Sequence, residues 1–458
     1  MPFTSLRYAL FLPVVVAAYF GCPPRFRWLL LLGASYFFYA NWDAGFLGAL
    51  VASTLLTYLL ALGMARQTAD PGRHRWLSVG VVGNLGLLVV FKYLAIFPGI
   101  LAPIGISFFT LQAIGYLLDV LREERPPERH IGYFASYMAF FPHVTAGPIP
   151  RSTRVLPQFR GAPAAQYHQL SCGMRQVMWG LFQKVVVADN LGMFVDSVYG
   201  DVRLYSGFPL LFATFFFSMQ LYCDFAGYSN VALGSAKLLG FDLMKNFDRP
   251  YLAQSLAEFW RRWHISLSCW LADNVHKPLA VSLRANPRAG LVTAVLTTFI
   301  LCGLWHGATY NYLAWGLLHG VGLSALVLTS RQRKRFERQV PALAYSVACV
   351  LLTFVFVSFT WIFFRANDMS DALYVVRHIG ALEPGVLIGV PTISRGTFVK
   401  DVVLALVVIL SDVFAPSLDR ALAWLGPSLG NYCCLVGLGF CIYVFGAFEK
   451  QSFIYAQF

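Results

Sequence analysis

Residues 342–364 read ALAYSVACVLLTFVFVSFTWIFF, without one charged side chain. A helix that crosses a bilayer needs about 20 mostly apolar residues, so this stretch predicts a transmembrane helix. The whole chain has the same character, because 58% of its 458 residues are hydrophobic, 12% are charged and the mean hydropathy is +0.61. Soluble domains carry about 25% charged residues. The composition therefore predicts an integral membrane protein and excludes a secreted enzyme, a nucleic-acid-binding protein and a disordered scaffold.

The apolar runs are long and continuous, which favours helices over the alternating segments of about ten residues found in membrane barrels. We expect an all-α fold with about 11–12 transmembrane helices and additional re-entrant or interfacial helices. The candidate spans are residues 8–22, 27–40, 44–64, 76–97, 99–120, 173–198, 207–224, 288–305, 310–329, 342–364, 400–414 and 431–447. Residues 131–148 are apolar but brief and end in Thr-Ala-Gly-Pro, which favours a re-entrant or buried half-helix.

The net charge of +13 comes from 35 basic and 22 acidic residues. In membrane proteins Lys and Arg collect in cytoplasmic loops. If the N-terminus lies outside, the basic segments 241–287 and 331–338 both fall inside, and twelve crossings return the C-terminus to the outside. No repeat or separate soluble domain is evident, so we expect one multi-pass domain over 1–458, with a motif core at about 100–366. No C-x-x-C pair occurs, and no metal site is predicted.

Histidines in apolar surroundings are the first candidates for chemistry, because polar groups are costly in a membrane. Ser255 and Glu258 have the spacing of a helix capping box. A helix that starts there and continues to Trp270 would place His264 at the edge of a stripe of tryptophans. This pattern favours an interfacial helix with a hydrogen-bonded His264, and leaves a catalytic His264 as the alternative.

Two further histidines occur in a short motif that appears twice, as Gly303-Leu-Trp-His306-Gly307 and as Gly316-Leu-Leu-His319-Gly320. The glycines have the small-xxx-small spacing that lets helix backbones approach closely. A buried hydrogen-bonded histidine and a general base, which imidazole suits near neutral pH, are both open interpretations. There is no G-x-S-x-G, H-E-x-x-H or P-loop motif.

Two acidic residues beside aromatic stretches, Asp119 and Asp224, keep a different class of function open. They could mark an ion path in a transporter. Capping, or pairing with an arginine near the interface, is the more common role of such residues.

Longer motifs along the chain closely resemble the membrane-bound O-acyltransferases, in particular the bacterial branch that contains membrane subunits of alginate O-acetyltransferases. The resemblance covers residues 30–366 and the last six. The matching stretches are Pro103–Thr110, Phe141–Pro148, Gly180–Lys184, Asp224–Ser229, Asn246–Tyr251, Glu258–Ser268, Gly303–Gly307, Trp361–Ala366 and Phe453–Phe458.

The resemblance implies a ring of tilted helices around a tunnel, in which a cytoplasmic acyl donor meets an acceptor from outside. His306 corresponds to the invariant histidine of the family, and His264 to a second position that is Asn or His. The implied roles are a general base for His306 and orientation or polarisation of the acyl carbonyl for His264, with His319 in support. Arg261 and Arg262 could bind donor phosphates or be ordinary membrane-surface charges.

The last six residues resemble an aromatic tail of these bacterial acyltransferases, in which a tyrosine hydroxyl receives the acyl group. The resemblance implies that Tyr455 is an acyl relay, although Ala456 replaces a phenylalanine of the family pattern. An unstructured terminus is the alternative.

The expected function is O-acetylation of an exported cell-surface polysaccharide at the bacterial inner membrane. The donor would be acetyl-CoA or another acyl thioester, used as a substrate, and no tightly bound cofactor is expected. The expected partners are a periplasmic SGNH-type acyltransferase or polysaccharide-modifying protein, a polysaccharide synthase or export complex, and membrane lipid, but no nucleic acid. The alternatives are a transporter or flippase subunit without transferase chemistry and a structural subunit of an export complex.

Overall fold

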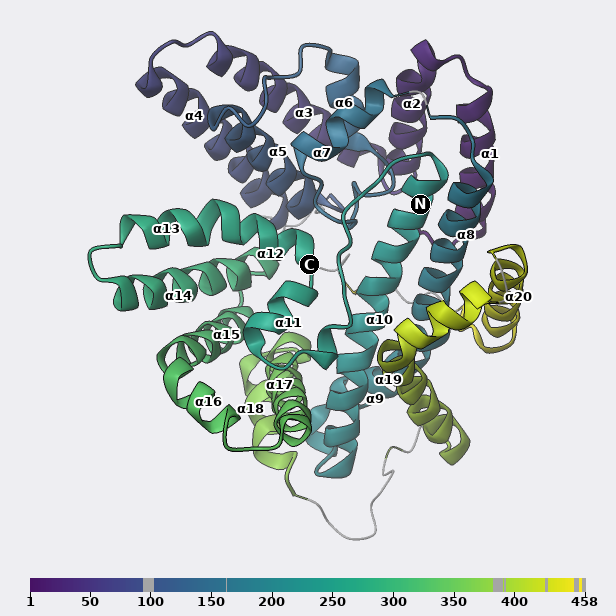
Figure 1. Ribbon diagram of the computed structural model, residues 1–458, viewed down its shortest axis with the longest axis vertical. Helices are drawn as coiled ribbons and strands as arrows, with labels where there is room; N and C mark the ends of the chain where they lie inside the picture. Colours follow the sequence, from purple (N-terminus) through teal and green to yellow (C-terminus); the bar gives the residue numbers. More distant parts are fainter. Residues whose placement is uncertain are drawn as a thin grey trace. The chain divides into compact units, whose positions relative to one another are not determined.

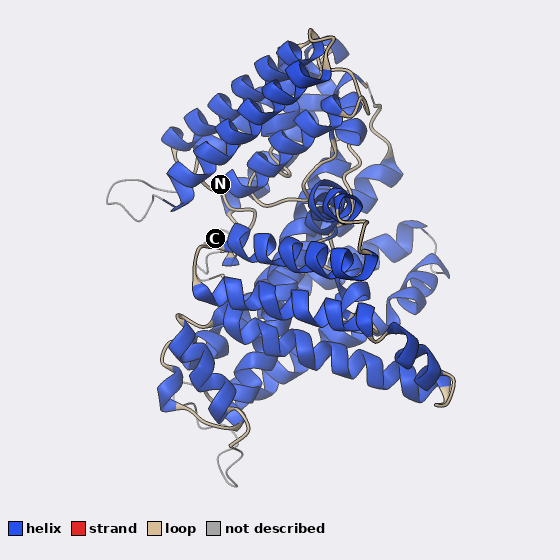
Figure 2. Cartoon of the chain, turned by 90° about the vertical axis from the view of Figure 1, so that its left-hand side faces the viewer, coloured by secondary structure: helices blue, strands red, loops and turns tan. Residues whose placement is uncertain are grey.

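The computed structural model describes residues 1–93, 103–161, 163–381, 390, 393–424, 427–448 and 453–454. Within these ranges every regular element is helical (Figure 2), which confirms the predicted all-α class. The α-helices (Figure 1) are α1 (Leu6–Gly21), α2 (Arg27–Ala40), α3 (Ala44–Ala65), α4 (Asp70–Leu88), α5 (Ile106–Leu121), α6 (Ile131–Ala139), α7 (Ser152–Val155), α8 (Tyr167–Leu181), α9 (Asp189–Tyr199), α10 (Phe208–Leu238), α11 (Leu256–Arg262), α12 (Ile265–Leu271), α13 (Lys277–Ser282), α14 (Pro287–His306), α15 (Tyr310–Leu328), α16 (Ser330–Glu337), α17 (Ala342–Arg365), α18 (Met369–His378), α19 (Arg395–Trp424) and α20 (Pro427–Phe445).

Shorter helical turns join or extend these helices. The 3-10 turns are η1 (Pro24–Phe26), η4 (Leu156–Arg160), η6 (Val202–Leu204) and η7 (Pro250–Leu252), and the π-helical turns are η2 (Val89–Tyr93), η5 (Phe182–Ala188) and η8 (Ala272–His276). The predicted span 173–198 therefore falls on α8, η5 and α9 in succession. Single π-helical turns inside α-helices often occur at functional sites.

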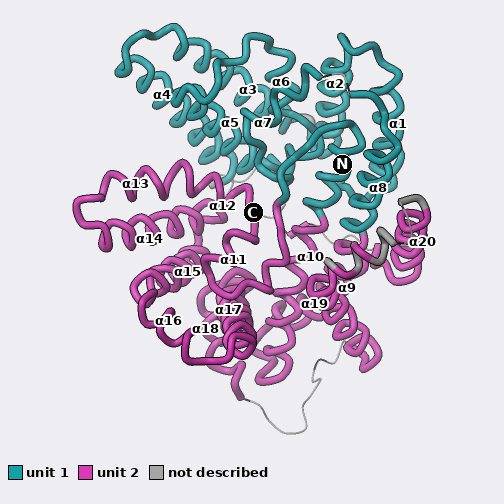
Figure 3. The backbone as a smooth tube through the Cα atoms, in the orientation of Figure 1, with its two compact units in different colours: residues 1–181, 228–245, 455–457 teal, residues 182–227, 246–454, 458 magenta. Residues whose placement is uncertain are grey.

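The chain forms two compact units, which Figure 3 colours separately. Of the described residues, unit 1 comprises those within 1–181 and 228–245, and unit 2 comprises those within 182–227 and 246–454. Helix α10 contributes to both, with the boundary after Gly227. One acyltransferase domain over 1–458 stays a prediction.

Within unit 1, buried polar side chains join helices that are otherwise apolar. Asn84 on α4 is fully buried, accepts a hydrogen bond from the Ser53 hydroxyl at 2.6 Å and donates one to Thr57 at 3.2 Å. The hydroxyls of Tyr8 and Ser235 lie 2.6 Å apart, also buried. Such bonds between helices satisfy groups that lipid could not.

The apolar stretch 131–148 forms the short helix α6, followed by buried irregular backbone. Ser35 of α2 accepts a hydrogen bond from the Phe141 amide at 3.0 Å, and the Tyr137 hydroxyl donates to the Pro150 carbonyl at 3.0 Å. The protein itself thus supplies partners that this backbone needs away from water. A buried half-helix is confirmed, while re-entry into a membrane stays a prediction.

Six helices among the described residues are long and apolar enough to cross a membrane, so the chain is a multi-pass membrane protein. They are Gly45–Ala65, Asp70–Lys92, Phe208–Leu238, Pro287–His306, Tyr310–Leu328 and Ala342–Arg365. Leu6–Gly21, Ile106–Leu121 and Leu429–Phe445 are shorter apolar helices. The predicted spans 76–97 and 99–120 lie partly outside the described residues. The total of 11–12 crossings and the orientation stay predictions.

The predicted end of span 207–224 is wrong, because α10 continues to Leu238. Small and polar residues such as Ser229 and Gly234 end the apolar run after Asp224. These residues serve helix packing: a Cβ atom on Gly234 would lie 2.7 Å from the carbonyl oxygen of Gly173 on α8. Hydropathy cannot separate such a packed polar face from the end of a helix.

Helices α14 and α15 approach closely at glycines, as their small-xxx-small spacing predicts. A Cβ atom on Gly303 would lie 2.3 Å from the Tyr312 carbonyl oxygen, and one on Gly316 would lie 2.3 Å from the Phe299 carbonyl oxygen. Because the obstacles are backbone atoms, a side chain at either position must push the helices apart.

Replacing Gly316 with Ala should therefore destabilise unit 2 by about 1–3 kcal/mol, the usual cost of overpacking. The midpoint of thermal unfolding in detergent should fall. Gly437→Ala on α20 is the matched control, since a Cβ atom there meets no described atom within 4 Å. Equal unfolding midpoints for both variants would contradict the close packing of α14 on α15.

Candidate active site

The local structure around His264 differs from the predicted continuous helix. The Ser255 hydroxyl accepts a hydrogen bond from the Glu258 amide at 3.2 Å, which confirms the predicted helix start. Helix α11 then ends at Arg262, and α12 begins at Ile265. His264 lies between them with φ 43° and ψ 53°, in the left-handed region. The prediction of one helix through Trp270 is wrong.

The break has a physical cause in the segment Asn246–Asp248. The Asp248 amide donates to the Arg262 carbonyl, and the Ile265 amide donates to the Asn246 carbonyl, both at 2.9 Å. The Asn246 carboxamide oxygen also accepts the Ser266 amide at 3.1 Å. Backbone groups that a continuous helix would pair internally are thus bonded to this distant segment.

Asn246 also fixes the tautomer of His264. Its side-chain oxygen accepts from the Ser266 amide and hydroxyl, and it lies 3.2 Å from Nδ1 of His264. Because an amide oxygen only accepts, Nδ1 carries the proton and the neutral ring keeps its lone pair on Nε2. His264 is 1% exposed, and burial lowers its pKa to about 3, so its imidazole is neutral at physiological pH.

His306 is the last residue of α14 and is buried in an aromatic surrounding. Its ring makes edge-to-face contacts with Trp315 on α15 at 5.2 Å and with Phe364 on α17 at 5.1 Å, between ring centroids. The half-buried Trp305 ring lies 4.8 Å from the His306 ring and 6.3 Å from the His264 ring. The structure therefore brings the two predicted catalytic histidines to one shared indole within unit 2.

His319 has both ring nitrogens engaged. The Trp260 indole donates to Nδ1 at 3.2 Å, so Nε2 carries the proton. Nε2 lies 3.0 Å from the Thr360 hydroxyl, which donates to the Val357 carbonyl at 2.7 Å. His319 thus joins α11, α15 and α17, and its ring lies 5.1 Å from that of Trp315, the neighbour of His306.

The two predicted arginines differ in their surroundings. Arg262 binds Glu258 on the same helix, with Nη2 2.6 Å from the carboxylate. Arg261 is exposed. Arg261 is therefore the more accessible of the two to a partner from solvent or the membrane surface.

The predicted relay Tyr455 lies outside the described residues, but the two residues before it are described. The Ile454 amide donates to the Asp224 carboxylate at 2.9 Å. Asp224 is buried and forms an ion pair with Lys184, a partner that is not among the capping, arginine-pairing and ion-path roles left open by the sequence. In unit 1, Asp119 accepts a hydrogen bond from Ser152 at 2.6 Å. Both acids are thus engaged by protein groups.

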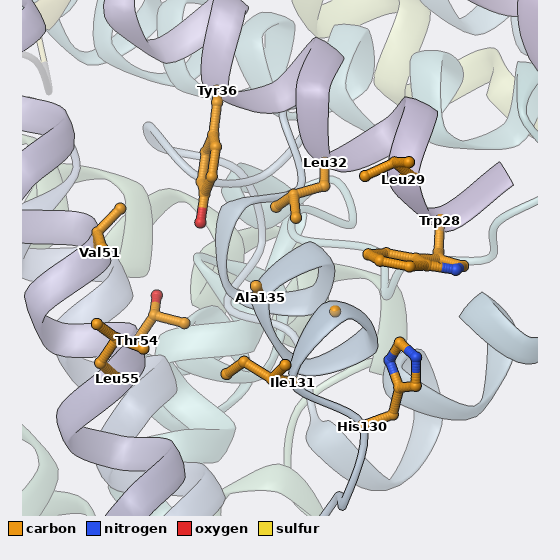
Figure 4. Close-up of a pocket in the computed structure, with 11 residues that line it drawn as sticks. Trp28, Leu29, Leu32, Tyr36, Val51, Thr54, Leu55, His130, Ile131 and Ala135 are labelled. Atoms are coloured by element: carbon orange, nitrogen blue, oxygen red, sulfur yellow. The ribbon is translucent and has the colours of Figure 1, made fainter. Parts of the chain in front are cut away.

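A cavity of about 460 Å³ lies elsewhere, within unit 1, among α2, α3 and the start of α6 (Figure 4). Trp28, Tyr36, Thr54 and His130 are among its lining residues. None of the predicted site residues that the structure describes is among its lining residues. Among the described residues, no group of three or more His, Cys, Asp or Glu side chains could hold a metal ion.

Three residues that build this site, Asn246, Trp315 and Thr360, have no functional role predicted from the sequence. Asn246 opens one of the motifs that resemble the acyltransferases, which was its only signal. Trp315 and Thr360 lie in apolar helices and carry no local pattern that separates them from ordinary core residues.

Comparison with known proteins places the chain in a family. A family model described as MBOAT, the membrane-bound O-acyltransferase family, matches residues 35–366. The chain belongs to this family. It is accordingly a membrane acyltransferase. The matched range includes the resembling motifs from Pro103 to Ala366, while the tail motif at 453–458 lies outside it.

Several relatives carry functional names. The chain is 36% identical to the probable alginate O-acetylase AlgI of Pseudomonas aeruginosa, covering 79% of this chain and 71% of the relative. It is 32% identical to the peptidoglycan O-acetyltransferase of Helicobacter pylori, covering 82% and 78%. It is also 32% identical to the teichoic acid D-alanyltransferase of Streptococcus thermophilus, covering 51% and 59%.

The left-handed backbone at residue 264 should restrict which side chains the position accepts. Asn, Asp and His enter this region most readily, whereas β-branched residues are strongly disfavoured. We expect His264→Asn to fold normally and His264→Val to lose about 1–3 kcal/mol of stability. The measurement is thermal unfolding in detergent, and equal stability of the two variants would contradict the assigned conformation.

The stability difference between the wild type and His264→Asn should depend on pH, and the sign follows from the pKa of His264. Since the folded pKa of His264 is about 3, the unfolded chain binds more protons below pH 6.5, and acid removes stability. His264→Asn should therefore lose less stability than the wild type between pH 7 and pH 5.

Proposed function

We propose that this protein transfers an acetyl group from acetyl-CoA, taken up on the cytoplasmic side of the bacterial inner membrane, to hydroxyl groups destined for an exported polysaccharide. The observation that carries the proposal is the pair of buried histidines, His306 and a neutral His264, whose rings both lie near that of Trp305. Relatives named for alginate and peptidoglycan O-acetylation favour a glycan acceptor.

In the proposed reaction His306 acts as the general base. It takes the proton of the attacking hydroxyl while the oxygen bonds to the thioester carbonyl carbon. The tetrahedral intermediate then collapses, the carbon–sulfur bond breaks, and the coenzyme A sulfur leaves with the proton from the His306 imidazolium. An aromatic, water-poor surrounding strengthens these electrostatic interactions.

His264 orients the reacting groups in this proposal. Its Nδ1 proton is committed to Asn246, so in the neutral ring Nε2 carries the lone pair and no proton. Polarisation of the acyl carbonyl would instead need a proton on Nε2, and burial opposes a second proton on the ring. His319 supports the site by holding Trp260 and, through its ring contact, Trp315.

The proposal assigns Tyr455 as the relay that carries the acetyl group toward an extracytoplasmic partner. That partner would be a periplasmic SGNH-type acyltransferase or another polysaccharide-modifying protein, associated with a synthase or export complex. Arg261 is the better placed of the two arginines for donor phosphates, because Arg262 is bound to Glu258. Membrane lipid surrounds the complex.

His306→Ala should reduce acetyl transfer at least about 100-fold, the usual contribution of a general base. Purified protein is given labelled acetyl-CoA, and label on the protein or an added glycan acceptor is measured. His276→Ala, at a half-buried histidine outside the site, is the control. Transfer that persists in His306→Ala would remove its role as base, and intact thioester crossing a vesicle membrane would indicate a transporter.

Tyr455→Phe should abolish acetylation of the polymer in cells, because the relay oxygen is lost, and removal of the last six residues should do the same. The protein should remain in the membrane at the wild-type level. Tyr443→Phe, an exposed tyrosine on α20, is the matched control. Unchanged polymer acetylation in Tyr455→Phe would disprove the relay.

A further inference from the structure

The chain near its C-terminus is bonded to buried residues of unit 2 at Ile454. Its amide donates to one carboxylate oxygen of Asp224 at 2.9 Å. The ring of the preceding residue, Phe453, lies 6.1 Å from the ring of Phe225, the residue after Asp224. A backbone bond and an aromatic contact thus hold the same two-residue segment on one turn of α10.

A buried charge cluster holds Asp224 in place. Lys184 Nζ lies 2.5 Å from the other oxygen of Asp224 and 2.7 Å from an oxygen of Asp189, and all three side chains are buried. One ammonium group faces two carboxylates, so Asp224 keeps capacity to accept a further hydrogen bond. A buried ion pair adds little net stability, which leaves room for a role in placing the segment that it binds.

Residues 184–190, which include Lys184, also bond to the chain at Phe445 and Ala447. The Asn190 side chain donates to the Phe445 carbonyl at 2.9 Å, and the Ala447 amide donates to the Val185 carbonyl at 2.8 Å. Lys400 donates to the Asn190 side-chain oxygen at 2.6 Å. Residues 184–190, around the π-helical turn η5, therefore bond directly to the chain just after α20 and hold the acid that binds Ile454.

Phe225 connects this anchor to the candidate active site. Its ring makes an edge-to-face contact with the His264 ring at 4.7 Å, and it also contacts Phe453. Asp224 and Phe225 are consecutive, so the group that binds the Ile454 amide is one residue from a side chain that touches His264.

We propose that Lys184 and Asp224 form a docking site for the protein's own C-terminal tail and position it for acyl transfer. This inference rests on the proposed relay at Tyr455, the residue that follows Ile454. Asp224 and Lys184 are positioning residues: they raise the local concentration of the relay hydroxyl at the histidines without touching the donor.

A purely structural ion pair is the competing explanation, and a change in the tail separates the two. Ile454→Pro removes the amide proton that binds Asp224 and leaves Lys184, Asp189 and Asp224 unaltered. Ile454→Ala retains the amide proton and should therefore reduce the rate of Tyr455 acetylation less than Ile454→Pro does. Phe448→Pro is the control, because it introduces the same proline constraint on the backbone at an exposed residue outside the docking site.

The experiment uses the full-length protein in detergent with labelled acetyl-CoA in a single turnover. Acetyl-Tyr455 is quantified by mass spectrometry, and hydrolysis of the thioester is followed in parallel. Loss of one hydrogen bond to a charged group should slow Tyr455 acetylation about 10- to 100-fold in Ile454→Pro. The KM for acetyl-CoA and its hydrolysis should stay at the wild-type values, as in Phe448→Pro. Carboxypeptidase should trim the tail faster in Ile454→Pro.

Wild-type rates of both acetylation and trimming in Ile454→Pro would overturn the docking site and leave the relay standing. A wild-type protein that never carries acetyl on Tyr455, yet acetylates an added glycan, would overturn the relay. In that case the rate at which carboxypeptidase trims Ile454→Pro, compared with the wild type, would still show whether the tail docks. Asp224→Asn is the second variant and should also speed trimming. Asp189→Asn should not, since the Ile454 amide bonds to Asp224, whereas Asp189 pairs with Lys184.

Discussion

The carboxamide of Asn246 is the contact on which the candidate site depends. One oxygen receives the Ser266 amide and hydroxyl and faces Nδ1 of His264. This set of bonds starts α12 from outside the helix, offsets the cost of a left-handed residue and selects the tautomer of the imidazole. The position of His264, its backbone conformation and its tautomer therefore share one origin.

Three buried histidines of unit 2, His264, His306 and His319, lie in aromatic surroundings, and the hydrogen bonds of His264 and His319 differ. His319 uses both nitrogens to join helices, which leaves it no lone pair for catalysis. His264 commits Nδ1 and keeps the lone pair on Nε2. His306 lies at the end of α14 beside Trp305, and the proposed function assigns it the proton transfer between acceptor and donor.

Much of the fold could be predicted because hydropathy is a local property. The run 342–364 corresponds to α17, Ala342–Arg365, within one residue. Prediction failed where a distant partner decided the structure. Asn246 lies 18 residues before His264 and breaks a helix that the local 3.6-residue pattern favours. The polar end of α10 is helical because it packs on α8, which no window of hydropathy includes.

In the site, too, local motifs predicted some residues, whereas contacts with distant segments determined others. The family motifs pointed to His264 and His306, and the structure brings both to Trp305. Asp224 looked from the sequence like a lone acid beside aromatic residues, because its ion partner and its bond to Ile454 come from distant parts of the chain. In a membrane protein such acids are too costly to leave unpaired. The identity of the partner therefore carries the functional information: a lysine holds the carboxylate, and the amide that it receives belongs to the segment leading to Tyr455.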